Sequence, residues 1–109
     1  MSSPDASRSS EQPLVQIVLE PLLEDFQYWF DETLVLLASP SAHCLEPDER
    51  QALAAQLTTA QQEVATARSL LLATEGQAGV DIAVVGQWHQ LVSRCWQTSR
   101  YVRTHGQTD

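Results

Sequence analysis

The side chains most able to do chemistry in this chain are the carboxylates between residues 20 and 32. Glu20 and Glu24 are four residues apart, and Asp31 and Glu32 follow them. Paired carboxylates perform acid–base catalysis when burial raises the pKa of one of them. Glutamates bind a di-iron centre when Glu-x-x-His motifs accompany them, and this sequence contains no such motif. Helical spacing places these acids mainly on a polar side, so the sequence predicts a solvated face rather than an acid–base site.

Histidine and cysteine provide the other possible chemistry, as metal ligands or nucleophiles. His43 and Cys44 are adjacent, whereas His89 and Cys95 are six residues apart and do not share a helix face. This spacing matches no zinc-binding pattern, and it provides no nucleophile–base pair. The sequence therefore predicts neither a metal site nor a cofactor. Both cysteines are expected to be free thiols, with a disulfide between them as the alternative.

Composition and charge narrow the classes of function. The chain has 109 residues, a net charge of −8 and no lysine. A negative charge disfavours nucleic acids and anionic lipid surfaces, and the lack of lysine removes Schiff-base and Walker-type phosphate chemistry. No apolar run is long enough for a membrane span, and the first residues lack the layout of a signal peptide. We therefore expect a cytoplasmic protein that is not an enzyme and does not insert into membranes.

Hydrophobic periodicity predicts three helices and no strand. The helices are expected at residues 13–38, 47–74 and 81–104, as one domain between a disordered polar tail over residues 1–12 and a short tail over residues 105–109. Short connections favour an antiparallel three-helix bundle that runs up, down and up. A helical hairpin that assembles as a dimer is the alternative. Pro21 removes a backbone hydrogen bond, so the first helix is expected to kink or restart there.

Each predicted helix has an apolar stripe that is expected to form the core. The first stripe consists of Val15, Leu22, Phe26, Trp29, Thr33 and Leu36, with Val18, Leu19, Phe30 and Leu37 beside it. The second and third stripes are Leu53, Leu57, Ala60, Val64, Ala67 and Leu71, and Val85, Trp88, Val92, Cys95, Ser99 and Val102. Gly76 is expected to cap the second helix and Asp81 to begin the third. Gly86 is expected to allow a close approach between helices.

Two groups of residues outside these stripes are candidates for binding a partner. On the first helix, Ile17, Tyr28 and Val35 lie opposite the core stripe, with Glu24 and Asp31 among them. On the third helix, His89, Trp96 and Arg103 lie along the border of the core face, and Arg100 lies one turn from Trp96. Single exposed apolar residues are normal, and a border row also covers the core edge. The functional interpretation is a recognition surface, because tryptophan and arginine are typical of binding hot spots.

Three blocks of sequence resemble a cyanobacterial family of small proteins classed as a domain of unknown function. These blocks are "LEPLLEDFQYWF", "AQQEVATARSLLLATEGQAGVD" and "WHQLVSRCW", and the similarity covers about residues 14–103. The resemblance implies a cyanobacterial cytoplasm as the location. It implies no activity or ligand, so it identifies no catalytic residue.

The sequence therefore favours a non-enzymatic protein-interaction module, an adaptor or assembly factor in cyanobacteria. Its protein partner is unidentified, and a photosynthetic or carbon-fixation component is suggested by the organism alone. A homodimer is compatible with the second apolar stripe of the first helix. The alternative function is a small carrier of an apolar ligand or pigment, in a bundle pocket walled by Trp29, Trp88 and Trp96.

Overall fold

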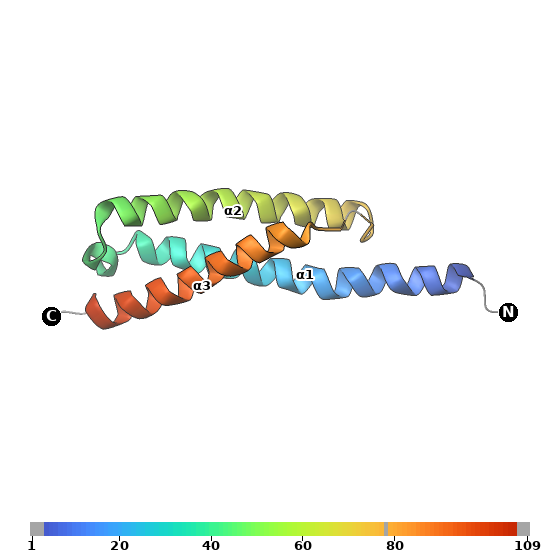
Figure 1. Ribbon diagram of the computed structural model, residues 1–109, viewed down its shortest axis with the longest axis horizontal. Coiled ribbons are helices and arrows are strands. Elements are labelled where there is room, and N and C mark those ends of the chain that lie inside the picture. The colour runs from blue at the N-terminus through green and yellow to red at the C-terminus, as the bar shows by residue number, and fades with distance from the viewer. Residues whose placement is uncertain (1–3, 78, 107–109) are drawn as a thin grey trace.

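Three long helices and one short 3₁₀ helix make up the described part of this protein. The computed structural model describes residues 4–77 and 79–106, with side chains from residue 16 onward (Figure 1). The elements are α1 (Pro4–Leu37), η1 (Pro40–Cys44), α2 (Pro47–Ala73) and α3 (Ile82–His105). α2 returns alongside α1, and α3 runs again in the direction of α1 (Figure 1). The predicted all-α class and the up-down-up three-helix bundle are confirmed.

α1 begins well before the predicted start at Pro13. It starts at Pro4, so residues 4–12, which were expected to form a disordered tail, lie in the helix. Once a helix has nucleated, each further residue adds one hydrogen bond, and proline suits the first turn because its missing N–H has no partner there. Residues 1–3 of the expected tail lie outside the described residues. At the other end α3 continues to His105, and residues 107–109 are also outside them.

α1 continues through Pro21 as one helix, so of the expected kink or restart the restart does not occur. Pro21 itself is exposed, but the residues on both sides of it pack on the core. Leu23 is buried, and Leu19 and Leu22 are half-buried against the same cluster. This packing holds the backbone in the helix and overrides the local preference of proline.

The ends of α2 and the start of α3 follow the sequence signals closely. α2 begins at Pro47 as predicted. After the end of α2 the backbone turns at Gly76, whose φ of 89° lies in the left-handed region. The Gly76 N–H donates to the carbonyl of Leu71 at 2.8 Å, which satisfies a carbonyl at the helix end. The Asp81 carboxylate accepts from the Ala83 N–H at 2.9 Å, which confirms the predicted N-cap of α3.

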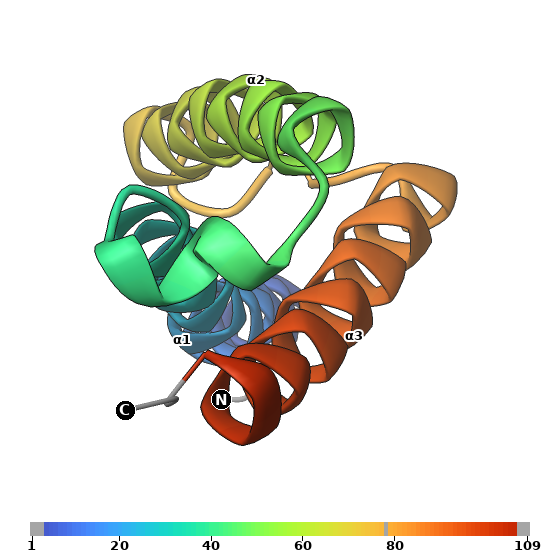
Figure 2. The ribbon, with the colours of Figure 1, turned by 90° about the vertical axis from the view of Figure 1, so that its left-hand side faces the viewer.

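The core of α1 is rotated from the predicted stripe. Its buried residues are Leu23, Phe26, Phe30, Thr33 and Leu37. Leu22, Trp29 and Leu36 are only half-buried, and Val18 is 60 % exposed. The reason is tertiary: α1 packs against both α2 and α3, so its buried face is centred between the two directions of contact (Figure 2). The side chain of Val15 lies outside the described residues.

The predicted stripes of α2 and α3 are buried except for Ala67, Val85 and Ser99, which are half-buried. Both supply buried residues to one core, including Leu57, Val64, Trp88, Val92 and Cys95. Phe26 of α1 meets the Trp88 ring edge-to-face, with centroids 5.8 Å apart. By contrast, a Cβ at Gly86 would meet no atom within 4 Å, so the expected close helix approach at Gly86 is wrong.

α1 and α2 run antiparallel in a register set by two polar contacts. Arg68 of α2 pairs with Glu24 of α1, and Gln61 of α2 donates to Asp31 of α1. This register places Ala73, the last residue of α2, level with Leu19. The N-terminal part of α1 therefore extends beyond the other two helices (Figure 1). The molecule is a rod of 70 × 20 × 19 Å.

Candidate functional site

The two surfaces predicted on separate helices meet at a pair of tryptophans. Trp29 of α1 and Trp96 of α3 pack edge-to-face with ring centroids 5.7 Å apart, and Tyr28 packs edge-to-face on Trp29 at 5.0 Å. Tyr28 is 54 % exposed and Trp96 is 45 % exposed, whereas Trp29 is half-buried between them. We call this cluster of Tyr28, Trp29 and Trp96 the aromatic face.

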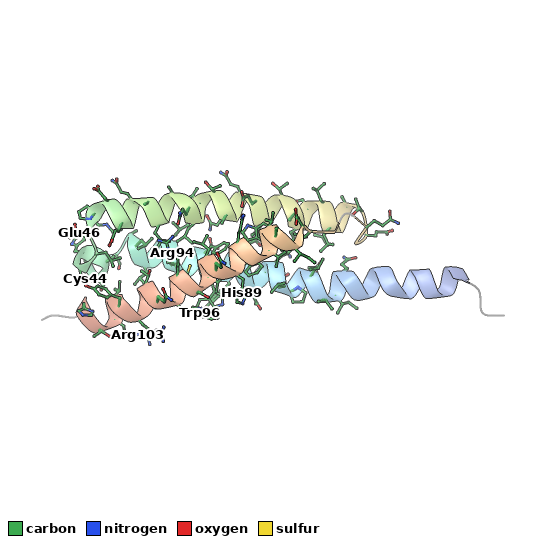
Figure 3. The ribbon with its side chains drawn as sticks, viewed as in Figure 1. Cys44, Glu46, His89, Arg94, Trp96 and Arg103 are labelled. Carbon is green, nitrogen blue, oxygen red and sulfur yellow. The ribbon has the colours of Figure 1, made fainter. Side chains whose placement is uncertain are left out.

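Opposite charges flank the aromatic face on its two helices. Asp25 and Glu32 of α1 are exposed, and so are Arg100 and Arg103 of α3. Within the described residues, none of these four side chains takes part in an ion pair. Figure 3 shows Trp96 and Arg103 along the same edge of α3 as His89. The surface therefore has an aromatic centre, an acidic side and a basic side.

Glu24 and Asp31 point toward α2 rather than toward a free surface. Glu24 accepts a hydrogen bond from the Arg68 guanidinium at 2.8 Å, and Asp31 accepts one from the Gln61 side-chain amide. Exposed ion pairs contribute ~0–1 kcal/mol to stability. Both acids therefore contact α2 while remaining exposed, and their place among the partner contacts stays a prediction.

Ile17 and Val35 are exposed, as the sequence predicts. Both residues belong to α1. Ile17 is 65 % exposed at about the level where α2 ends, and Val35 is 69 % exposed near the end of α1 itself. Val35 lies seven residues after Tyr28 and Ile17 lies eleven before it, which is ~10 Å and ~16 Å along the helix. They extend the outer side of α1, but they do not belong to the aromatic face.

The predicted pocket walled by three tryptophans is not formed. Trp29 and Trp96 pack together on the α1–α3 side, whereas Trp88 lies toward α2. Sequence reasoning missed a groove between α2 and α3, which consists of two hollows of about 450 and 490 Å³. Trp88 lines both hollows, and its indole N–H donates to a Glu63 carboxylate oxygen at 3.1 Å. The alanines and threonines of α2 are the signal that could have revealed it, since small side chains leave room between helices.

The thiols and carboxylates do not form a reactive centre in the described residues. Cys44 and Cys95 are free thiols. Burial raises the pKa of the Cys95 thiol above its ordinary value of 9.0, and a hydrogen bond with Thr33 offsets only part of this effect. Because the thiolate is the nucleophilic form, Cys95 is a poor nucleophile. Across residues 4–77 and 79–106, no three histidine, cysteine, aspartate or glutamate side chains converge as metal ligands.

Comparison with known proteins identifies the family of this chain but not its function. Residues 9–104 match a family described as a protein of unknown function (DUF2605). The chain belongs to this family. The DUF2605 region spans most of the chain, so it includes the bundle, the aromatic face and the α2–α3 groove. Curated proteins and solved structures gave no match. In the part of the chain that the structure describes, no helix is long and apolar enough to cross a membrane.

Proposed function

We propose that this DUF2605 protein is a non-enzymatic protein-interaction module, an adaptor or assembly factor of the cyanobacterial cytoplasm. The observation that carries the proposal is the contact between Trp29 and Trp96. It joins the exposed side chains of α1 and α3 into one surface and leaves Tyr28 and Trp96 half exposed. A photosynthetic or carbon-fixation component is the proposed client, on the family resemblance alone.

The chemistry of the aromatic face suits recognition of a protein. Tryptophan, tyrosine and arginine are enriched among the residues that contribute most binding energy in protein interfaces. Trp96 is held by its packing on Trp29, so little side-chain freedom would be lost when a partner covers it. Arg100 and Arg103 supply charged donors beside the aromatic rings. A partner that covers the rings and offers carboxylates toward α3 would match this arrangement.

Affinity capture from a cyanobacterial lysate tests the proposal. We expect the wild-type chain to retain a stoichiometric protein, and Trp96→Ala and Tyr28→Ala to weaken its retention at least about tenfold. Leu72→Ala on α2 is the matched control, because Leu72 is 44 % exposed and lies outside the aromatic face. Circular dichroism establishes that all variants remain helical.

Two outcomes would contradict this function. Retention of the same protein by folded Trp96→Ala and Tyr28→Ala variants would exclude the aromatic face as the binding surface. A visible absorbance band from a tightly bound pigment, in the protein purified from its native host, would instead support the alternative function as a carrier of an apolar ligand or pigment.

A further inference from the structure

We infer that the aromatic face binds a second copy of this chain, with α1 of each copy lying over α3 of the other. The inference rests on the proposed function, since it concerns the same surface: a reversible dimer would cover the aromatic face when no client is bound to it. It is carried by the distribution of charge on that face. Acidic side chains are on the α1 side and arginines are on the α3 side, so the face is complementary to itself.

The tryptophan contact determines which charges lie at the same level. Glu32 follows Trp29 by three residues and Arg100 follows Trp96 by four, on helices that run in the same direction (Figure 1). At 1.5 Å per residue these offsets are ~4.5 Å and ~6 Å. Glu32 and Arg100 therefore lie at nearly the same level, on opposite sides of the aromatic face. No ion pair joins them in the described residues.

A two-fold axis along the line between α1 and α3 would bring these charges together. It places Glu32 of each copy over Arg100 of the other, so that two equivalent ion pairs enclose the packed aromatic rings. A two-fold axis across the helices would instead place α1 over α1 and α3 over α3. With the tryptophans still packed at the axis, that arrangement sets Glu32 near Asp25 of the other copy, which costs binding energy, and it leaves Arg100 over α3, which has no acidic residue. The charges therefore select the parallel arrangement.

The size of the face suits a weak dimer. The apolar row of α1 that contains Trp29 continues beyond the aromatic face, from the exposed Val18 to the half-buried Leu36, which is ~27 Å along the helix. The rod is about 20 Å wide. Two such faces would bury on the order of 1,000 Å², close to the lower limit of specific interfaces. We therefore expect a reversible dimer whose population changes over accessible protein concentrations.

Charge reversal measured by sedimentation velocity tests this dimer. We expect wild-type chain to self-associate, and Glu32→Arg or Arg100→Glu alone to weaken the dimer at least about tenfold, because each sets like charges opposite each other. An equimolar mixture of the two variants should associate again, since both contacts between unlike copies then join an acidic side chain to a basic one. Only a contact between copies predicts this rescue by mixing.

Glu49→Arg controls for the change in net charge, because Glu49 is exposed on α2 and lies outside the aromatic face. It should leave association unchanged. A wild-type chain that stays monomeric at millimolar concentration would overturn the inference, and so would single reversals that the mixture does not rescue. A monomer that still captures another protein through Trp96 would overturn the dimer and leave the proposed function intact.

Discussion

At the residue scale, the three tryptophans have three different roles. Trp88 is buried, contacts Phe26 and donates its indole N–H to Glu63. Trp29 lies between core and surface, and Trp96 is half exposed against it. On α3, the core residue Trp88 and the exposed ring of Trp96 in the candidate binding surface are therefore only eight residues apart.

Gly86 lowers the stability of α3, although no neighbouring side chain or backbone requires a glycine there. It lies within α3, it is exposed, and an added Cβ would meet no neighbour within 4 Å. Because glycine costs a helix interior ~0.5–1 kcal/mol relative to alanine, we expect Gly86→Ala to raise the free energy of unfolding by that amount. Thermal unfolding followed by circular dichroism should show a midpoint several degrees higher, at ~4–8 °C per kcal/mol.

Gly106 provides the opposite case at the end of the same helix. A Cβ there would overlap the carbonyl oxygens of Ser41 and Val102, which belong to backbone and cannot rotate away. Gly106→Ala should therefore lower the melting midpoint. If Gly106→Ala left the midpoint unchanged or raised it, the described packing of α3 against η1 would be wrong.

At the element scale, α1 keeps its helix through a proline. Pro21 leaves the carbonyl of Ile17 without its usual intrahelical donor, yet the leucines around Pro21 pack on the core that α1 shares with α2 and α3. Around Pro21 the helix therefore exists because of its contacts, as most helices in folded proteins do.

Replacing this proline should stabilise the protein. We expect Pro21→Ala to raise the free energy of unfolding by ~1–3 kcal/mol, because the hydrogen bond to Ile17 returns and the clash disappears. Urea titration at constant pH measures the change. Pro47→Ala is the control, since Pro47 occupies the first turn of α2, where proline removes no hydrogen bond. Loss of a proline also gives the unfolded chain more freedom, which lowers stability, so Pro47→Ala should give no gain. An equal gain from both variants would contradict a cost of Pro21 that is specific to the helix interior.

At the scale of the whole molecule, the long helices make a rod. Its radius of gyration is 18.0 Å, whereas a compact domain of this length would have ~13 Å. The length comes from α1, which continues past the end of α2 (Figure 1). A rod has a large lateral surface for its mass, which favours side-by-side association.

Small-angle X-ray scattering can distinguish modes of association by length. We expect dilute protein to give a radius of gyration near 18.0 Å, and the dimer to keep a maximum dimension near 70 Å, because the proposed two-fold axis runs along the rod. A maximum dimension that approached twice this length would show end-to-end association. That result would contradict a dimer through the aromatic face.

The sequence by itself determined the elements of this protein. The heptad stripe of α2, the caps at Gly76 and Asp81, and the core residues of α3 were all readable, because they depend on neighbours within a few residues. The same local reasoning failed for residues 4–12, it left both a kink and a restart open at Pro21, and it misplaced the rotation of the α1 stripe. Contacts with α2 and α3 decide the last two of these.

Only the tertiary structure decided how the candidate surface is assembled. Periodicity placed Tyr28 on the outer side of α1 and Trp96 along the border of the core face of α3, but it could not place them together, since the angle and level at which two helices pack depend on their side chains jointly. The same packing turned Glu24 and Asp31 toward α2 and separated Trp88 from the other two tryptophans. Helical period sets which side of a helix a residue occupies, whereas packing between helices sets which residues share a surface.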